Sequence, residues 1–117
     1  MSRINKMILE SLQSKFIDIT ENELEAAVEA VKVCLESIGA DFTVDVNSID
    51  PAEDKIIVAD FDVVSDLDLE DMKNERIAVI DDINSCIEAV GIIVVEGPIN
   101  EYGYRITLER VPNRFGW

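Results

Sequence analysis

The same pattern of residues occurs twice in the sequence, and this repeat restricts the fold more than any other feature. A shift of 52 positions, from 28 to 80, aligns Val28, Val31, Cys34, Leu35, Glu36, Ile38 and Gly39 with Ile80, Ile83, Cys86, Ile87, Glu88, Val90 and Gly91. Two strand patterns follow each copy. A fixed period of this kind indicates internal duplication. We therefore expect an α+β fold, α-(αββ)-(αββ), with a four-stranded antiparallel sheet and the helices on one face.

Hydrophobic periodicity places the individual elements. Apolar residues three and four positions apart predict helices over 4–17, 21–38 and 69–90. Thr20 and Glu23 form a capping-box pattern at the start of the second helix, and Gly39 follows its end. Alternating or β-branched segments predict strands over 41–47, 55–64, 92–96 and 104–111. The two repeats thus occupy 20–64 and 68–111, and a short tail, 112–117, follows them.

The length and composition suit one domain over 1–117. A chain of 117 residues with 48% apolar residues can fill a single core. The aromatic fraction is only 6%, so we expect that core to be aliphatic. No apolar run approaches the roughly 20 residues that a membrane helix needs, and the N-terminus lacks the pattern of a signal peptide. These features predict a soluble cytoplasmic protein.

The chain contains no histidine, which excludes several kinds of active site. Histidine is the usual general base and a frequent metal ligand near neutral pH, so catalytic triads and ordinary zinc sites are not expected. No glycine-rich phosphate loop is present. Cys34 and Cys86 fit buried, reduced thiols at equivalent positions of the repeats rather than a disulfide scaffold. The sequence therefore predicts a protein that is not an enzyme and needs no cofactor.

Acidic charge dominates the middle of the chain. The formal net charge is −15, and 22 of the 25 acidic residues lie between positions 18 and 96. Such a field repels nucleic acid and anionic lipid and attracts basic proteins or cations. We therefore expect a basic protein partner, and neither direct nucleic-acid binding nor membrane binding.

Two groups of acidic residues are candidates for partner binding. The first lies on the second helix, where like charges recur at a spacing of four that weakens a helix. The second is dense around the end of the second predicted strand. The candidates are Glu21, Glu25, Glu29 and Glu36, and Asp60, Asp62, Asp66, Asp68, Glu70 and Asp71. One interpretation is a solvated acidic surface; the other is a docking surface, which in its sharpest form mimics nucleic-acid phosphates.

The second acidic group also allows a metal-site interpretation. Asp60 and Asp62 share a strand face, and nearby carboxylates are typical ligands of Mg²⁺ or Ca²⁺. However, counting from Asp66 gives neither the glycine nor the final glutamate of an EF-hand loop. Asp66, Asp68 and Asp71 also suit a helix N-terminus. A carboxylate-dependent metal enzyme is therefore the alternative, not the main hypothesis.

The sheet face away from the helices is expected to be unusually apolar. Period-two alternation assigns Ile56, Val58, Ile93 and Val95 to this face. Four apolar side chains together on an exposed sheet face are typical of a contact surface, and we therefore expect a homodimer. The functional hypothesis is a small acidic binding protein that modulates or inhibits a basic, nucleic-acid-binding protein, as viral anti-host proteins do in the host cytoplasm. An adaptor or assembly subunit is a further alternative.

Overall fold

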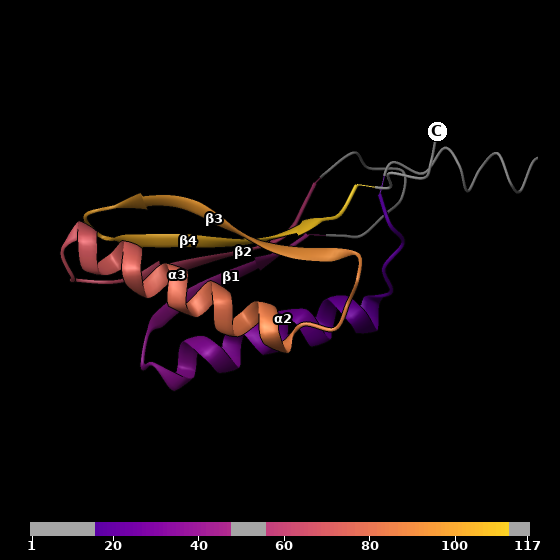
Figure 1. Cartoon of the computed structure of the whole chain (residues 1–117), viewed down its shortest axis with the longest axis horizontal. Helices are drawn as coiled ribbons and strands as arrows, with labels where there is room; N and C mark the ends of the chain where they lie inside the picture. The colour runs from indigo at the N-terminus through magenta and orange to yellow at the C-terminus, as the bar shows by residue number, and fades with distance from the viewer. Residues whose placement is uncertain (1–15, 48–55, 113–117) are drawn as a thin grey trace, which may run out of the picture.

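The computed structural model of the protein describes residues 16–47 and 56–112. Its elements, in chain order, are α2 (Glu21–Ser37), β1 (Asp41–Val46), β2 (Ile57–Val64), α3 (Leu69–Cys86), β3 (Ile92–Asn100) and β4 (Gly103–Arg110). The strands form one antiparallel sheet in the order β1-β2-β4-β3. Both helices lie on the same side of this sheet and run in opposite directions (Figure 1). The predicted α+β class, with a four-stranded antiparallel sheet, is confirmed.

The order helix–strand–strand occurs twice, as the sequence predicts. The inner strands β2 and β4 pair antiparallel at the centre of the sheet, and β1 and β3 form its edges. The hairpins differ: residues 47–56 join β1 to β2, whereas Glu101 and Tyr102 alone join β3 to β4. Duplication of the sequence therefore stays a prediction. The first predicted helix lies outside the described residues except for Phe16 and Ile17, and Phe16 forms an isolated bridge with Pro112.

The local signals of α2 are confirmed at both ends. The Thr20 side chain accepts a hydrogen bond from the Glu23 amide, and the Glu23 carboxylate accepts one from the Thr20 amide. After the helix, the amides of Gly39 and Ala40 donate to the carbonyls of Glu36 and Leu35. This Schellman pattern needs a left-handed residue, and Gly39 has a φ of +71°.

The end of α3 differs from the prediction. The helix stops at Cys86 rather than near Val90, whose exposed fraction is 78%. Ile87 already has an extended conformation, and its amide donates to the carbonyl of Ile83. Gly91, which directly follows the predicted helix, lies beyond its observed end and allows its backbone to approach Ile19. An added Cβ there would collide with the Ile19 side chain and lie 3.3 Å from the Ile17 carbonyl oxygen.

The core lies between the helices and the sheet. It is mainly aliphatic, as expected from the composition, and its largest fully buried side chains are Phe61, Leu35, Met72, Ile83, Ile106, Leu108, Val31 and Val58. Along β2 and β4, successive side chains alternate between the helix side and the opposite side of the sheet, with the expected period of two. We call the sheet face that points away from the helices the open face.

A bulge in β2 moves two residues, Val58 and Ile56, away from the sheet face that the alternation predicts for them. Ile57 pairs with Glu109 and Ala59 pairs with Leu108, so Val58 is an extra residue in β2. A β-bulge of this kind shifts the alternation by one position. Val58 is therefore only 1% exposed and belongs to the core, whereas the prediction assigned it to the open face. Ile57 takes the place opposite Glu109 instead, and Ile56, whose carbonyl accepts a hydrogen bond from the Arg110 amide, lies on the helix side.

Candidate docking site

Apart from Glu36, near the C-terminus of α2, the predicted acidic residues lie in three separate places. Glu21, Glu25 and Glu29, here called the α2 row, lie along α2. Asp66, Asp68, Glu70 and Asp71 surround the start of α3, at the opposite end of the sheet from the start of α2 (Figure 1). Asp60 and Asp62 lie on the open face of β2. The structure therefore does not unite these residues into one acidic surface.

The α2 row borders a groove between α2 and the end of β1. The groove has a volume of 570 Å³. Its residues are Glu21, Leu24, Glu25, Val28, Glu29, Lys32, Val46 and Asn47. Leu24 and Val28 are buried, whereas the three glutamates are exposed. The groove thus combines an apolar floor with an acidic rim, and this combination could not be inferred from the spacing of the glutamates alone.

The charge of the α2 row is not neutralised locally. Successive glutamates at a spacing of four lie about 6 Å apart along a helix axis. None of the three forms an ion pair with another residue in the described part of the chain, although Lys32 lines the same groove. Glu36 is exposed near the C-terminus of α2, whose last turn contains no basic residue. Carboxylates are unfavourable at that end of a helix. The helix therefore tolerates electrostatic repulsion along its length.

Three of the acidic residues at the start of α3, Asp68, Glu70 and Asp71, have a structural role. Asp68 is the N-cap, and its carboxylate accepts a hydrogen bond of 2.8 Å from the Asp71 amide. Glu70 and Asp71 lie in the first turn, where the helix dipole favours negative charge. These positions are explained by helix formation without a partner.

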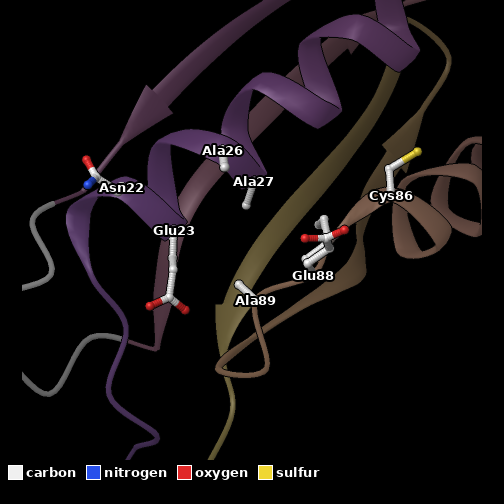
Figure 2. Close-up of a pocket in the computed structure, with 8 residues that line it drawn as sticks. Asn22, Glu23, Ala26, Ala27, Cys86, Glu88 and Ala89 are labelled. Atoms are coloured by element: carbon white, nitrogen blue, oxygen red, sulfur yellow. The ribbon is translucent and has the colours of Figure 1, made fainter.

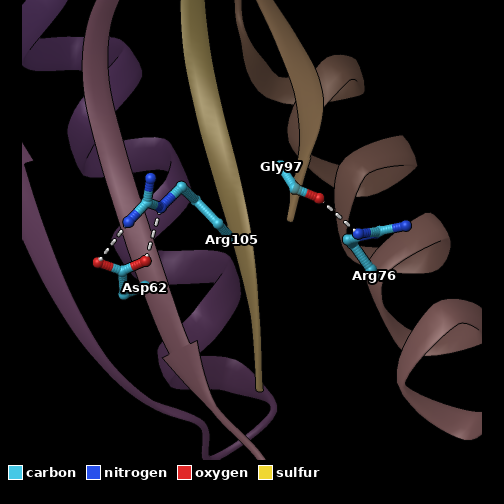
Figure 3. A network of polar contacts seen from close by, with 4 residues as sticks. All are labelled: Asp62, Arg76, Gly97 and Arg105. Atoms are coloured by element: carbon cyan, nitrogen blue, oxygen red, sulfur yellow. Dashed lines mark hydrogen bonds and ion pairs between the residues drawn. The ribbon is translucent and has the colours of Figure 1, made fainter. Parts of the chain in front are cut away.

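The open face holds Asp62 in an ion pair. Arg105 on β4 is its partner in the strand register, and Arg105 Nε lies 2.7 Å from Asp62 Oδ1 (Figure 3). The hydrogen bond to this carboxylate raises the pKa of Arg105. Both side chains remain substantially exposed, so the pair contributes little to stability. Asp62 is therefore already matched with a cation.

Asp60 lies beside this pair in a less favourable setting. Its Oδ1 atom is buried and has no hydrogen-bond partner in the structure. Burial raises the pKa of the Asp60 carboxyl, Arg105 opposes the shift, and Asp62 and Asp45 add to it. Asp45 is the residue directly opposite Asp60 on β1. The charged form of Asp60 is thus disfavoured in the folded protein.

We predict that Asp60→Asn stabilises the protein at neutral pH by a few tenths to about 1 kcal/mol, because it removes a poorly solvated charge. A raised folded-state pKa means that the folded protein binds the proton more tightly than the unfolded chain. Protonation therefore removes the penalty, and the gain should vanish as the pH falls below the ordinary value of 3.8. Urea unfolding at pH 7 and pH 3 measures this, with Asp62→Asn as the control. A variant less stable than wild type at pH 7 would contradict the prediction.

The carboxylates do not assemble a metal site in the described ranges 16–47 and 56–112. No group of three or more aspartate, glutamate or cysteine side chains lies close enough there to hold a metal ion. Asp60 and Asp62 share a strand face as predicted, but the Asp62 carboxylate is already paired with Arg105, with which a metal ion would have to compete. The geometry of these residues gives the metal-enzyme alternative no support.

The apolar residues of the expected contact face are less concentrated than predicted. On this face Ile93 is 42% exposed and Val95 is half-buried, whereas Val58 lies in the core and Ile56, 50% exposed, lies on the helix side opposite Arg110. Thr107, Asp60 and the Asp62–Arg105 pair occupy the centre of the open face. The homodimer stays a prediction.

A second pocket lies on the other side of α2. It has a volume of 430 Å³ and lies between α2 and the segment that ends α3 (Figure 2). Cys86 is exposed at its border, and Cys34 is half-buried nearby. Burial raises the pKa of the Cys34 thiol, and the neighbouring Cys86 and Asp82 raise it further. A raised pKa lowers the fraction of reactive thiolate at Cys34. The prediction that both thiols are buried is wrong for Cys86, which is exposed because α3 ends at this residue.

Comparison of the chain with family models, with curated proteins and with solved structures gives no match. Within the described residues, no helix is long and apolar enough to cross a membrane. The function must therefore be inferred from the geometry and charge of the residues themselves.

Proposed function

We propose that this protein binds a basic surface of another protein through the α2 row and its groove. One observation carries the proposal: the α2 row is exposed, forms no ion pair within residues 16–47 and 56–112, and borders an apolar-floored groove of 570 Å³. Solvation of an acidic face does not require a groove, whereas a docking surface gains apolar area that a partner can bury. Asp68, Glu70 and Asp71 have a local explanation at a helix N-terminus, and Asp62 has one in a strand-to-strand ion pair.

The charge supports a protein partner of opposite sign. A net charge of −15 repels nucleic acid and anionic lipid over a distance of about one Debye length, roughly 8 Å at physiological salt. The same field speeds the approach of a basic protein. In its sharpest form the α2 row occupies the place of nucleic-acid phosphates on such a partner, so that binding inhibits it. No catalytic step is part of this proposal.

Neutralising the α2 row is expected to abolish most of the binding without harming the fold. In the α2-row variant, Glu21, Glu25 and Glu29 are replaced together by glutamine. Loss of like-charge repulsion should leave the free energy of unfolding unchanged or raise it by a few tenths of a kcal/mol. Capture of basic proteins from a cell extract at low and at high salt, followed by elution with an oligonucleotide, measures the binding. Wild type should retain basic proteins at low salt only, and the variant should retain few.

A control variant separates the site from the net charge. Asp66→Asn, Glu70→Gln and Asp71→Asn together remove the same charge at the start of α3 and leave the N-cap Asp68 in place. This α3-start variant should retain nearly the same proteins as wild type. If both variants lose capture equally, the α2 row is not the site. Elution by the oligonucleotide indicates phosphate mimicry, whereas resistance to it indicates an adaptor.

A further inference from the structure

Strand β1 leaves one of its edges unpaired in the described part of the sheet. It is the first strand in the order β1-β2-β4-β3 and pairs with β2 alone. The amide of Asn47 donates to the carbonyl of Val58 on β2. Because inward and outward backbone groups alternate along an antiparallel strand, the groups of Thr43 and Asp45 also face β2. The amides and carbonyls of Phe42, Val44 and Val46 therefore face outward.

The same three residues form an incompletely covered apolar surface, here called the β1 strip. Phe42, Val44 and Val46 pair with Val63, Phe61 and Ala59, whose side chains are buried on the helix side of the sheet. The β1 strip therefore also faces the helix side. Phe42 and Val44 are only half-buried, and Val46 is 49% exposed. The side chains at this edge thus lack part of the cover that the core gives to β2.

Acidic groups flank the β1 strip on both faces of the sheet. Val46 lines the same groove as the α2 row, which lies on the helix side. Asp41 and Asp45 are exposed on β1 and point to the open face. On the helix side, a strand beside β1 would therefore meet the apolar β1 strip, with the α2 row nearby. On the open face it would meet the carboxylates of Asp41 and Asp45.

We propose that an extended basic segment of the partner protein adds to β1 as a fifth strand. Its backbone would pair with the outward groups of Phe42, Val44 and Val46, the mode known as β-augmentation. Apolar side chains at alternate positions would cover the β1 strip on the helix side, and lysine or arginine side chains at the positions between them would face Asp41 and Asp45 on the open face. This inference rests on the proposed function and specifies the form of the partner.

Charge and strand regularity favour this edge and this occupant. The other edge strand, β3, is interrupted by a register shift between Glu96 and Ile99, and Pro98 lacks an amide hydrogen. A second copy of this chain would place Asp41 and Asp45 against like charges in a complex of two proteins that each carry −15. A basic strand meets opposite charge at every one of these positions.

The test is a titration of the full-length, ¹⁵N-labelled protein with two synthetic peptides. The probe is the capped heptapeptide Lys-Val-Lys-Val-Lys-Val-Lys, and the control replaces its central valine by proline. The probe should bind, and the amides of Phe42, Val44 and Val46 should become protected from hydrogen exchange. The amides of Thr43 and Asp45, already bonded to β2, should change little. The proline peptide should bind about tenfold more weakly, because proline removes a ladder hydrogen bond and bends the strand.

The results separate strand addition from docking by charge alone. Equal binding of both peptides without protection of the three amides would overturn the inference and leave the proposed function standing. Absence of binding by the probe would also overturn it. Protection of the three amides in the free protein that rises with protein concentration would show a second copy on this edge, and would overturn the basic segment as occupant. Failure of the proposed function itself would appear separately, as unchanged capture by the α2-row variant.

Discussion

Gly103→Ala is expected to destabilise the protein by at least about 3 kcal/mol, the upper end of the cost of overpacking. Gly103 begins β4 and pairs with Val64 on β2 and with Asn100 on β3. A Cβ atom at this position would overlap the Val63 carbonyl oxygen and lie 3.2 Å from the Val64 Cα atom. These are backbone atoms of a central strand, so they cannot move without breaking the pairing of β2 with its neighbours. Urea unfolding measures the loss.

Gly39→Ala is the matched control for this effect. Gly39 also has a positive φ, +71°, but a Cβ atom there would meet no heavy atom within 4 Å. Its replacement should therefore cost only the strain of a left-handed residue, about 1–2 kcal/mol. Equal losses in the free energy of unfolding for Gly103→Ala and Gly39→Ala would contradict the close approach of the β4 backbone to β2 at Gly103.

Arg76→Ala is the second change with a large expected effect, a loss of about 3 kcal/mol. Arg76 is a charged residue of α3 that is only 7% exposed. Its Nη1 donates a hydrogen bond of 2.7 Å to the Gly97 carbonyl (Figure 3), and its Nη2 lies 3.2 Å from the Glu96 carboxylate. Alanine would leave a cavity between α3 and β3 and an unpaired carbonyl next to it. The free energy of unfolding in urea is the measurement.

Arg105→Ala provides the comparison, because it removes the same side chain from an exposed ion pair. The Arg105 and Asp62 side chains are 42% and 56% exposed. Water replaces a contact of this kind at little cost, and the expected loss is below about 1 kcal/mol. Equal losses for the two arginine variants would contradict the difference in burial between α3 and the open face.

The parts of the fold that depend on residues close together in the sequence could be predicted. The capping box at Thr20 and the left-handed Gly39 are local signals, and both ends of α2 agree with them within a residue. The alternation of β1 likewise follows from its sequence. Period-two alternation predicts the wrong face for Val58 and Ile56, because the bulge arises from the pairing of β2 with β4 and cannot be read from the sequence of β2 alone. The end of α3 is also predicted wrongly. The glycine at position 91 allows a close approach to Ile19, which is distant in sequence, and does not mark the end of the helix.

The candidate site was predictable only in part. The spacing of Glu21, Glu25 and Glu29 indicates a row on one helix face, but not what lies beside that row. The groove exists because β1 is an edge strand next to α2, and strand order is a property of the whole sheet. Arg76 was overlooked for a similar reason, since its burial arises from contacts with residues about 20 positions away.

The association rate with the captured basic partner tests the docking claim most directly. Rates should be compared at low and at physiological ionic strength for wild type, the α2-row variant and the α3-start variant. Electrostatic steering acts mainly on the association rate and is screened by salt. We predict that the α2-row variant associates about tenfold more slowly at low ionic strength and approaches wild type as salt is added, while the α3-start variant stays close to wild type throughout. Equal rates for the two variants at every ionic strength would contradict a docking site on α2.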